Sequence, residues 1–245
     1  MIHPDEELGP RRIGALAAVL ALALALTALA AWLAPARGGA ATPATLPTRS
    51  TTLQPNPGYL IMPMGDSITV GAGSSSGTGY RGTLAALVPG ATWAGTQGTA
   101  PLWHEGHGSW TLDQLAAQAR NVVSVPRPRY VLLLAGTMDV AAGRTAAQLL
   151  ASTASVIAEI KAGSPKTVIL VMSIPVTTNG NAAQQQVERD YNAALPALVT
   201  AFLPRVRYLD VSDVGVGFDT THPSDSGYAV MAQRLAAALP QVIAD

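Results

Sequence analysis

Short apolar runs that lack a polar face alternate with helical patterns over most of the chain. The runs Tyr130–Leu134 and Val168–Val171 are apolar at every position except the tyrosine. A strand that is apolar on both faces is typical of a parallel sheet buried between two layers of helices. This feature constrains the fold more than any other in the sequence, because it predicts a sheet with helices on both sides.

Five strands and five helices are expected in alternation. The strand-like runs are Tyr59–Met64, Thr92–Ala94, Tyr130–Ala135, Thr167–Ser173 and Val206–Val211. The helical patterns are Gly82–Leu87, Leu112–Val123, Ala146–Ala162, Ala182–Phe202 and Ser226–Ile243. This order predicts an α/β fold, a three-layer α/β/α sandwich with a mainly parallel sheet of about five strands. In such a sheet, ligands bind at the carboxyl ends of the strands.

The first part of the chain does not share this alternation. Residues 1–12 include Arg11 and Arg12, and residues 13–36 form an uncharged run of mainly Ala and Leu. About 20 apolar residues span a bilayer, whereas the apolar part of a secretory signal is usually about 7–15 residues long. The run is therefore expected to be a transmembrane signal-anchor, with the two arginines on the cytoplasmic side.

Two other interpretations of this run stay open. The small-residue pattern Ala34-Pro35-Ala36 resembles a cleavage site, so that the run could be a signal peptide of a secreted protein. A buried helix of a soluble domain is disfavoured, because the run lacks a polar face. In both exported cases the rest of the chain faces outward, either on the extracellular side of the cell membrane or released from it.

Residues 37–58 are rich in Gly, Ala, Thr and Pro and are expected to be a linker. The folded domain is then expected at residues 59–245. Charged residues make up only 12% of the chain, and 15 basic residues balance 15 acidic ones. The chain therefore lacks the basic face of a nucleic-acid-binding protein. It contains no cysteine, which excludes disulfides, thiolate metal ligands and a cysteine nucleophile.

Polar motifs follow three of the expected strands. They are Gly65-Asp66-Ser67-Ile68-Thr69, Gly136-Thr137-Met138-Asp139 and Asp219-Thr220-Thr221-His222-Pro223. A serine hydrolase needs a hydroxyl beside a base, and a carboxylate that orients that base. Ser67, His222 and Asp219 supply these three groups. The three-residue spacing lets the Asp219 carboxylate reach the ring nitrogen of His222 that faces away from Ser67.

Together with Gly79-Tyr80-Arg81 and His104-Glu105-Gly106-His107, these motifs resemble those of the GDSL/SGNH hydrolase family. The resemblance is strongest to the carbohydrate-esterase branch typified by acetyl xylan esterases, and it extends from about residue 59 to residue 244. It implies that Ser67 is the nucleophile, that His222 is the general base and that Asp219 orients the base. It also implies that Asp66 braces the turn and that the Ser67 amide donates to the oxyanion.

Two positions depart from the family pattern, and both concern the oxyanion hole. Met138 stands where the family has an asparagine, so that a thioether without a donor replaces a side-chain amide. In the family's second loop, which in this chain contains His104-Glu105-Gly106-His107 and the residues after it, Gly108-Ser109-Trp110 reverses the Ser-Gly order of the family. Ser109 is then expected to donate its backbone amide, on the condition that the turn does not require a positive φ. The residues expected around the oxyanion and the substrate are Gly108, Ser109, Met138, Asp66, Gly136 and His107.

The sequence therefore predicts an exported serine esterase that removes acyl groups, with acetyl as the candidate group, from a carbohydrate and needs no cofactor. Catalysis is expected to be weakened by Met138, with Gln97 or the Ser109 amide as replacement donors. The sugar, the acyl length and the oligomeric state are left open by the sequence.

Two alternatives compete with this prediction. The first is a catalytically impaired carbohydrate-binding relative, in which tryptophans near the second loop stack on sugar rings: Trp93, Trp103 and Trp110. The second is a metal hydrolase built on the His104-Glu105-Gly106-His107 motif. It is disfavoured because two histidines three residues apart, without an identified third ligand, fall short of the usual zinc patterns.

Overall fold

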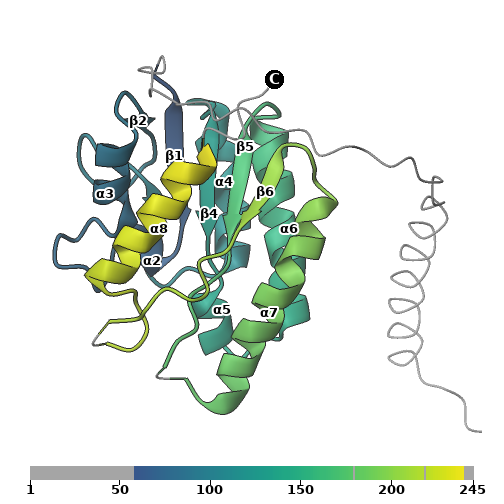
Figure 1. Ribbon diagram of the computed structural model, residues 1–245. Helices are drawn as coiled ribbons and strands as arrows, with labels where there is room; N and C mark the ends of the chain where they lie inside the picture. Colours follow the sequence, from purple (N-terminus) through teal and green to yellow (C-terminus); the bar gives the residue numbers. More distant parts are fainter. Residues whose placement is uncertain (1–57, 179, 218, 240–245) are drawn as a thin grey trace, which may run out of the picture. The chain divides into compact units, whose positions relative to one another are not determined.

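The computed structural model describes residues 58–178, 180–217 and 219–239 (Figure 1). The apolar run at 13–36, the residues before it and all but the last residue of the expected linker lie outside these ranges. Within them, the model contains no helix with the length and apolar character needed to cross a membrane.

The described residues form one six-stranded parallel sheet with the order β2-β1-β4-β5-β6, and β3 pairs with the end of β1. The strands are β1 Leu60–Gly65, β2 Thr92–Trp93, β3 Glu105–Gly106, β4 Tyr130–Leu134, β5 Val168–Met172 and β6 Val206–Leu209. All residues of β4 and β5 are buried. The predicted α/β fold with a parallel sheet is therefore confirmed.

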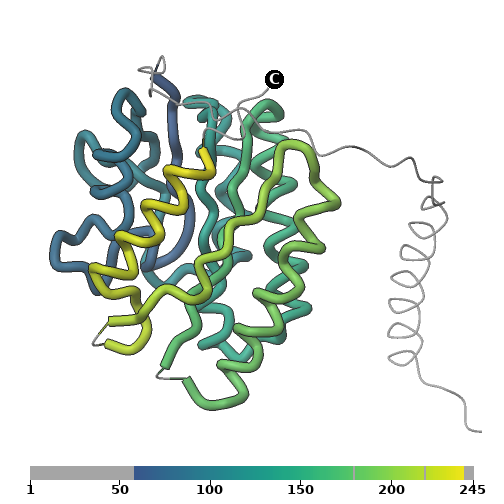
Figure 2. The backbone as a smooth tube through the Cα atoms, viewed as in Figure 1, coloured from purple at the N-terminus to yellow at the C-terminus, as the bar shows by residue number. Residues whose placement is uncertain are grey.

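Helices cover both faces of the sheet, as Figure 1 and the tube in Figure 2 show. They are α2 Ser67–Val70, α3 Tyr80–Leu87, α4 Leu112–Ser124, α5 Thr137–Ala141, α6 Ala146–Gly163, α7 Ala182–Thr200 and α8 Asp225–Ala238. Helix α3 packs against α8, and α6 packs against both α4 and α7. The five long helices lie within a few residues of their expected positions.

Three of the long helices begin at the carboxyl edge of the sheet, and each begins with a capping box. Thr111, Thr145 and Asn181 are N-caps, and each forms a capping box with a glutamine three residues later. Each box satisfies amide groups that the first helical turn leaves without partners, and an N-cap side chain typically contributes about 1 kcal/mol. These caps fix the loops around the edge where the polar motifs lie.

The strand β3 was not expected from the sequence. It contains only two residues, and its register pairs Met64 with Glu105 and Gly65 with Gly106. A two-residue segment has no periodicity to detect, so only the edge of β1 makes it a strand. Because of this pairing, the loop after Gly106 starts directly beside the end of β1, where the first polar motif lies.

Candidate active site

The end of β1 turns sharply into α2 and presents Ser67. The turn requires Gly65, because a Cβ there would collide with the carbonyl oxygen of Leu134. Asp66 is the N-cap, and its Oδ1 accepts a hydrogen bond of 3.0 Å from the Ile68 amide. Ser67 is the first residue of α2, and its own amide has no hydrogen-bond acceptor among the described residues. The turn thus places a hydroxyl and a free amide donor at the same point.

Ser67, His222 and Asp219 form a continuous chain of hydrogen bonds. The distance from His222 Nε2 to Ser67 Oγ is 2.9 Å, and the distance from His222 Nδ1 to Asp219 Oδ2 is 2.7 Å. The carboxylate lies on the side of the imidazole opposite Ser67. This is the arrangement in which a ring nitrogen can take a proton from the hydroxyl while the carboxylate fixes the tautomer.

Asp219 is held by its own loop. Its Oδ1 accepts hydrogen bonds from the amides of Thr221 and His222, at 3.0 and 2.9 Å. Burial works to raise the pKa of Asp219, but the bonds from the amides and from the His222 ring outweigh it and lower the pKa to about 2. Asp219 therefore carries its charge at neutral pH, as a partner of an imidazolium must.

The loop before α3 packs closely against His222. Gly73 has a φ of +80°, and a Cβ at this position would lie 2.7 Å from the Cβ of His222. The Tyr228 hydroxyl donates a hydrogen bond of 2.6 Å to the carbonyl of Ala72 and so ties this loop to α8. Any side chain at position 73 would displace the imidazole from Ser67.

Asp66 is fully buried in the turn that carries Ser67. Burial raises its pKa to about 6, although the Ile68 amide, the charge of His222 and the amides of Thr137 and Gly136 act in the opposite direction. Besides capping α2, this carboxyl group therefore lies close to the backbone of the Gly136-Thr137-Met138-Asp139 motif. The Asp66 amide also donates to the Leu134 carbonyl at the end of β4, at 3.3 Å.

In the loop after β4, Asp139 has a structural role, whereas Met138 is accessible. Asp139 is fully buried, accepts a hydrogen bond of 2.9 Å from the first amide of α4 at Leu112 and receives another from Arg144 at 2.6 Å. Met138 is only half-buried, and it lines a cavity of about 210 Å³ together with Thr221. The thioether therefore faces a cavity next to the His222 loop instead of filling the core.

The second loop is braced by His107. Its Nε2 lies 2.6 Å from Glu105 Oε1, and its ring stacks on Trp110 with centroids 3.7 Å apart. Glu105 also accepts hydrogen bonds from the amide and hydroxyl of Thr96. The His107 amide donates to the Gly65 carbonyl at 2.9 Å. His107 thus positions the loop that follows it beside the end of β1.

Ser109 was expected to fit the turn only without a positive φ, and the structure does not meet this condition. Its φ is +68°, in the left-handed region, which costs an L-residue roughly 1–2 kcal/mol relative to the right-handed region. Gly108, one residue earlier, has open space where a Cβ would lie. The reversed Gly-Ser order therefore puts the side chain at the strained position of the turn and the glycine at the unstrained one.

The tryptophans do not gather into one sugar-stacking surface. Trp93 is buried in the core at 8% exposure, and Trp103 is exposed. Only Trp110 lines the cavity of about 650 Å³ beside the second loop. Val70 of α2 and Gly106 of β3 also line this cavity, so it borders the elements on either side of the Ser67 turn, although Ser67, His222 and Asp219 are not among its lining residues.

No group of His, Cys, Asp and Glu side chains suited to a metal ion occurs in the described part of the chain. The Nδ1 of His104 accepts a hydrogen bond of 3.0 Å from the Gly106 amide. Burial, followed by the charge of Arg81, lowers the pKa of His104 to about 4. His104 is therefore a neutral imidazole whose Nε2 carries the proton at the cavity wall.

Arg81 supports the site in a way that the sequence did not reveal. It is buried, and its guanidinium donates to the carbonyls of Thr69, Val70 and Leu102 at 2.6–3.0 Å. It therefore joins the end of α2 to the second loop. The only signal in the sequence was the Gly79-Tyr80-Arg81 motif, which carried the family resemblance without a physical role.

Residues 64–230 match the family model described as the GDSL-like lipase/acylhydrolase family. The chain belongs to this family. It is accordingly an acyl ester hydrolase of the GDSL type, and the resemblance inferred from its motifs is confirmed. No curated protein matches the chain in sequence.

Solved structures of GDSL and carbohydrate esterases share the fold. A carbohydrate esterase family 3 protein from Talaromyces cellulolyticus gives a TM-score of 0.64 at 22% identity, over 76% of this chain and 98% of that one. A family 3 carbohydrate esterase from Clostridium thermocellum gives 0.64 at 24%, over 76% and 97%. A carbohydrate acetylesterase from Sinorhizobium meliloti gives 0.63 at 15%, over 76% and 100%. At these identities the likeness establishes the fold of this GDSL hydrolase.

Proposed function

We propose that this chain is a serine esterase that removes acetyl groups from a carbohydrate outside the cell. The observation that carries the proposal is the hydrogen-bonded chain from Ser67 through His222 to Asp219 at the carboxyl edge of the sheet. Acyl transfer to a serine requires a hydroxyl, a base, a carboxylate that orients the base and an amide donor for the oxyanion. The hydrogen-bonded chain supplies the first three groups, and the free amide of Ser67 supplies the fourth.

In the proposed reaction Ser67 Oγ attacks the ester carbonyl carbon, and its proton passes to His222 Nε2. The tetrahedral oxyanion accepts hydrogen bonds from the Ser67 amide and from the second loop. His222 then gives the proton to the departing sugar hydroxyl, and the acyl group remains on Ser67. A water molecule attacks this ester, gives its proton to His222 and releases the acid, and the proton returns to Ser67.

The cavity of about 650 Å³ supports a carbohydrate as the leaving group. Its lining residues include Trp110, His104 and Gln97, which are an aromatic residue and two residues with hydrogen-bonding side chains. Sites that bind small polar ligands use this combination of a few directed polar groups in a concave surface. The similar structures named above include carbohydrate esterases and an acetylesterase, which supports acetyl as the acyl group.

Export remains part of the proposal and is supported by the sequence alone. The uncharged run at 13–36, preceded by Arg11 and Arg12, favours an anchor in the cell membrane with the domain outside. A cleaved signal at Ala34-Pro35-Ala36 would give the same domain in secreted form.

A serine-directed fluorophosphonate tests the chemistry directly. We expect a single adduct, located on Ser67 by mass spectrometry of peptides, and we expect release of acetate from acetylated xylo-oligosaccharides to stop as the adduct forms. A chelator should leave this release unchanged. A folded protein that binds these oligosaccharides without forming an adduct or releasing acetate would contradict the proposal and support the binding-protein alternative.

Met138→Asn is expected to raise turnover. An oxyanion-hole donor contributes roughly 10²–10³-fold to turnover, and a new side-chain amide should recover part of it, about tenfold, with little change in substrate binding. The half-buried position beside the 210 Å³ cavity, whose wall includes Thr221, gives the amide polar surroundings. The measurement is kcat on an aryl acetate.

Met138→Leu is the matched control, because it changes the side chain's shape without adding a donor, and its kcat should equal that of the parent. An unchanged kcat in a Met138→Asn variant with the parent's melting temperature would show that position 138 does not face the oxyanion.

A further inference from the structure

The loops at the amino edge of the sheet carry only positive charge. Each of the four loops that lead from a helix into β2, β4, β5 or β6 lies at this edge, at residues 88–91, 125–129, 164–167 and 201–205. These loops contain no Asp or Glu. With the last turn of α6 and the start of β6 they contribute six cations, which we call the basic end: Arg127, Arg129, Lys161, Lys166, Arg205 and Arg207.

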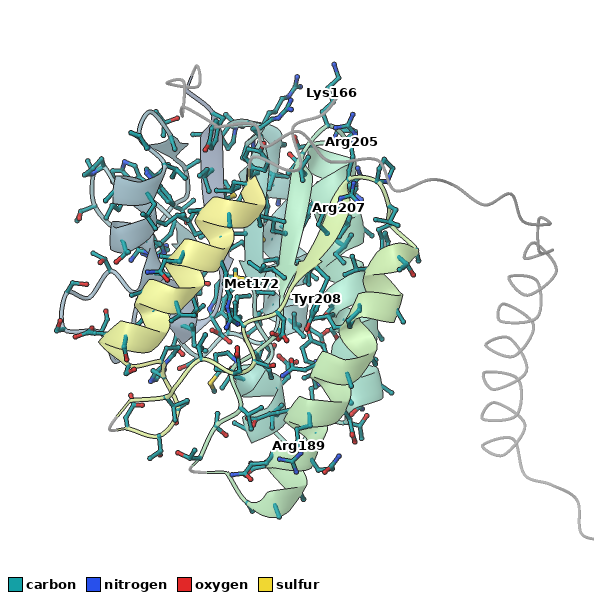
Figure 3. The ribbon with its side chains drawn as sticks, viewed as in Figure 1. Lys166, Met172, Arg189, Arg205, Arg207 and Tyr208 are labelled. Atoms are coloured by element: carbon teal, nitrogen blue, oxygen red, sulfur yellow. The ribbon has the colours of Figure 1, made fainter. Side chains whose placement is uncertain are left out.

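None of the six cations forms an ion pair with a carboxylate in the described part of the chain. They lie near one another: Arg205 donates to the carbonyl of Lys166 at 3.3 Å, and burial followed by the charge of Arg205 lowers the pKa of Lys161. Figure 3 shows Lys166, Arg205 and Arg207 toward one end of the sheet and Arg189 toward the other. Within the described residues, backbone carbonyls rather than carboxylates therefore offset the mutual repulsion of the cations, and these carbonyls accept hydrogen bonds from Arg127, Lys161 and Arg205.

Many of the carboxylates lie at the opposite edge, around the proposed active site, whereas Glu159, near the end of α6, is paired with Arg120. Those that follow the carboxyl ends of strands include Asp66, Asp139, Asp210, Asp213 and Asp219. The near-zero net charge of the whole chain hides this separation. The domain is polarised along the strand direction, with the basic end on the face that points away from Ser67.

Exposed apolar side chains accompany the cations. Val125 is 87% exposed, Leu203 is 49% exposed and Leu87, at the end of α3, is 42% exposed. Among the large apolar side chains that are exposed in the described part of the chain, only Trp103 lies elsewhere. Isolated exposed apolar residues are normal, but protruding aliphatic groups among unpaired cations are the composition of a membrane-interfacial surface.

The chain enters the domain at this same end. Gly58, two residues before β1, lines a cavity of about 750 Å³ whose wall also includes Arg127, Arg129 and Lys166. Only 21 residues, 37–57, separate Gly58 from the apolar run at 13–36, and a chain of that length reaches at most about 75 Å. If that run is held in a bilayer, the basic end is kept within reach of the lipid surface at high effective concentration.

We propose that the basic end docks on anionic phospholipid headgroups of the membrane that holds the apolar run, so that the active site faces away from the bilayer. The inference rests on the export and anchoring part of the proposed function. Phosphodiester headgroups match the unpaired Lys and Arg side chains, and the exposed Val125 and Leu203 contact the acyl boundary. The domain would thereby present its carboxyl edge to polymers outside the membrane.

The test uses the full chain, whose lack of cysteine allows a single label to be placed by mutation. Val125→Cys carries a polarity-sensitive fluorophore at the basic end, and Ala183→Cys carries it at the start of α7, at the opposite edge. Each chain is combined with phosphatidylcholine vesicles that contain a headgroup quencher, with or without phosphatidylglycerol. We expect quenching at position 125 only with phosphatidylglycerol, and none at position 183.

Lys166→Glu should lower the docked fraction at least about fivefold. One cation near an anionic surface contributes roughly 1 kcal/mol of binding free energy, and a tenfold change in the binding constant corresponds to about 1.4 kcal/mol. Arg189→Glu makes the same charge change on α7 and should have no effect. Hydrolysis of an aryl acetate verifies that both variants are folded. High salt should release the docked domain, because the charges are exposed to solvent.

Equal quenching at positions 125 and 183, or equal quenching with and without phosphatidylglycerol, would overturn the docking surface. The outcome is separate from that of the proposed chemistry, since Ser67→Ala should dock like the parent. If the apolar run does not hold the chain in the vesicles, the same labels report binding from solution. Absence of phosphatidylglycerol-dependent quenching would overturn the proposal in that case as well.

Discussion

Replacing Ser67 with alanine is expected to lower kcat on an aryl acetate by about 10⁴–10⁶-fold. The hydroxyl is the atom that would form the acyl-enzyme, and His222 Nε2 lies 2.9 Å from it. Without the hydroxyl, only the free amides and the binding cavity remain to act on the ester, and these give a small residual rate. The rate is measured with purified protein at several concentrations, so that a trace contaminant is recognised.

Ser155→Ala is the matched control for this variant. Ser155 is exposed on α6, where its hydroxyl donates only to the carbonyl of Ala151, so its loss should leave both turnover and melting temperature unchanged. A Ser67→Ala variant with the parent's turnover would remove Ser67 as the nucleophile and with it the mechanism proposed above.

Asp219→Asn is expected to lower kcat by about 10³–10⁴-fold, because it fixes the wrong tautomer of His222. Asp219 Oδ1 accepts hydrogen bonds from two backbone amides, and an asparagine must use its only side-chain oxygen to accept them. Its NH₂ group then points at His222 Nδ1, 2.7 Å away, and donates to it. The imidazole proton moves to Nε2, which can no longer take the proton of Ser67.

Asp219→Ala and Asp190→Asn complete this test. The alanine variant leaves His222 Nδ1 open to water, so it should lose less activity than the asparagine variant. A general destabilisation of the protein would not produce this order of activities. Asp190 is exposed on α7 and should tolerate asparagine without loss. If Asp219→Ala were the slower of the two, the tautomer argument would be wrong.

The sequence by itself determined the architecture, and it predicted the three residues that the structure joins by hydrogen bonds, Ser67, His222 and Asp219. Strands β4 and β5 were found within one residue of their ends, because an uninterrupted apolar run bounded by polar residues is a local signal. The Asp219-to-His222 geometry is also local, since three residues of one loop fix it. Ser67 joined them because parallel strands must bring their carboxyl ends to one edge.

Only the tertiary structure decided the roles of the residues around them. Ser109 takes a positive φ, Trp93 enters the core and His107 braces its loop through Glu105, and none of these could be read from residue type.

The basic end was hidden in the same way, because its cations come from loops far apart in sequence while the composition is neutral. The physical reason is common to all of these cases. Periodicity and spacing report on neighbours along the chain, whereas burial, loop conformation and charge clustering depend on residues that only folding brings together.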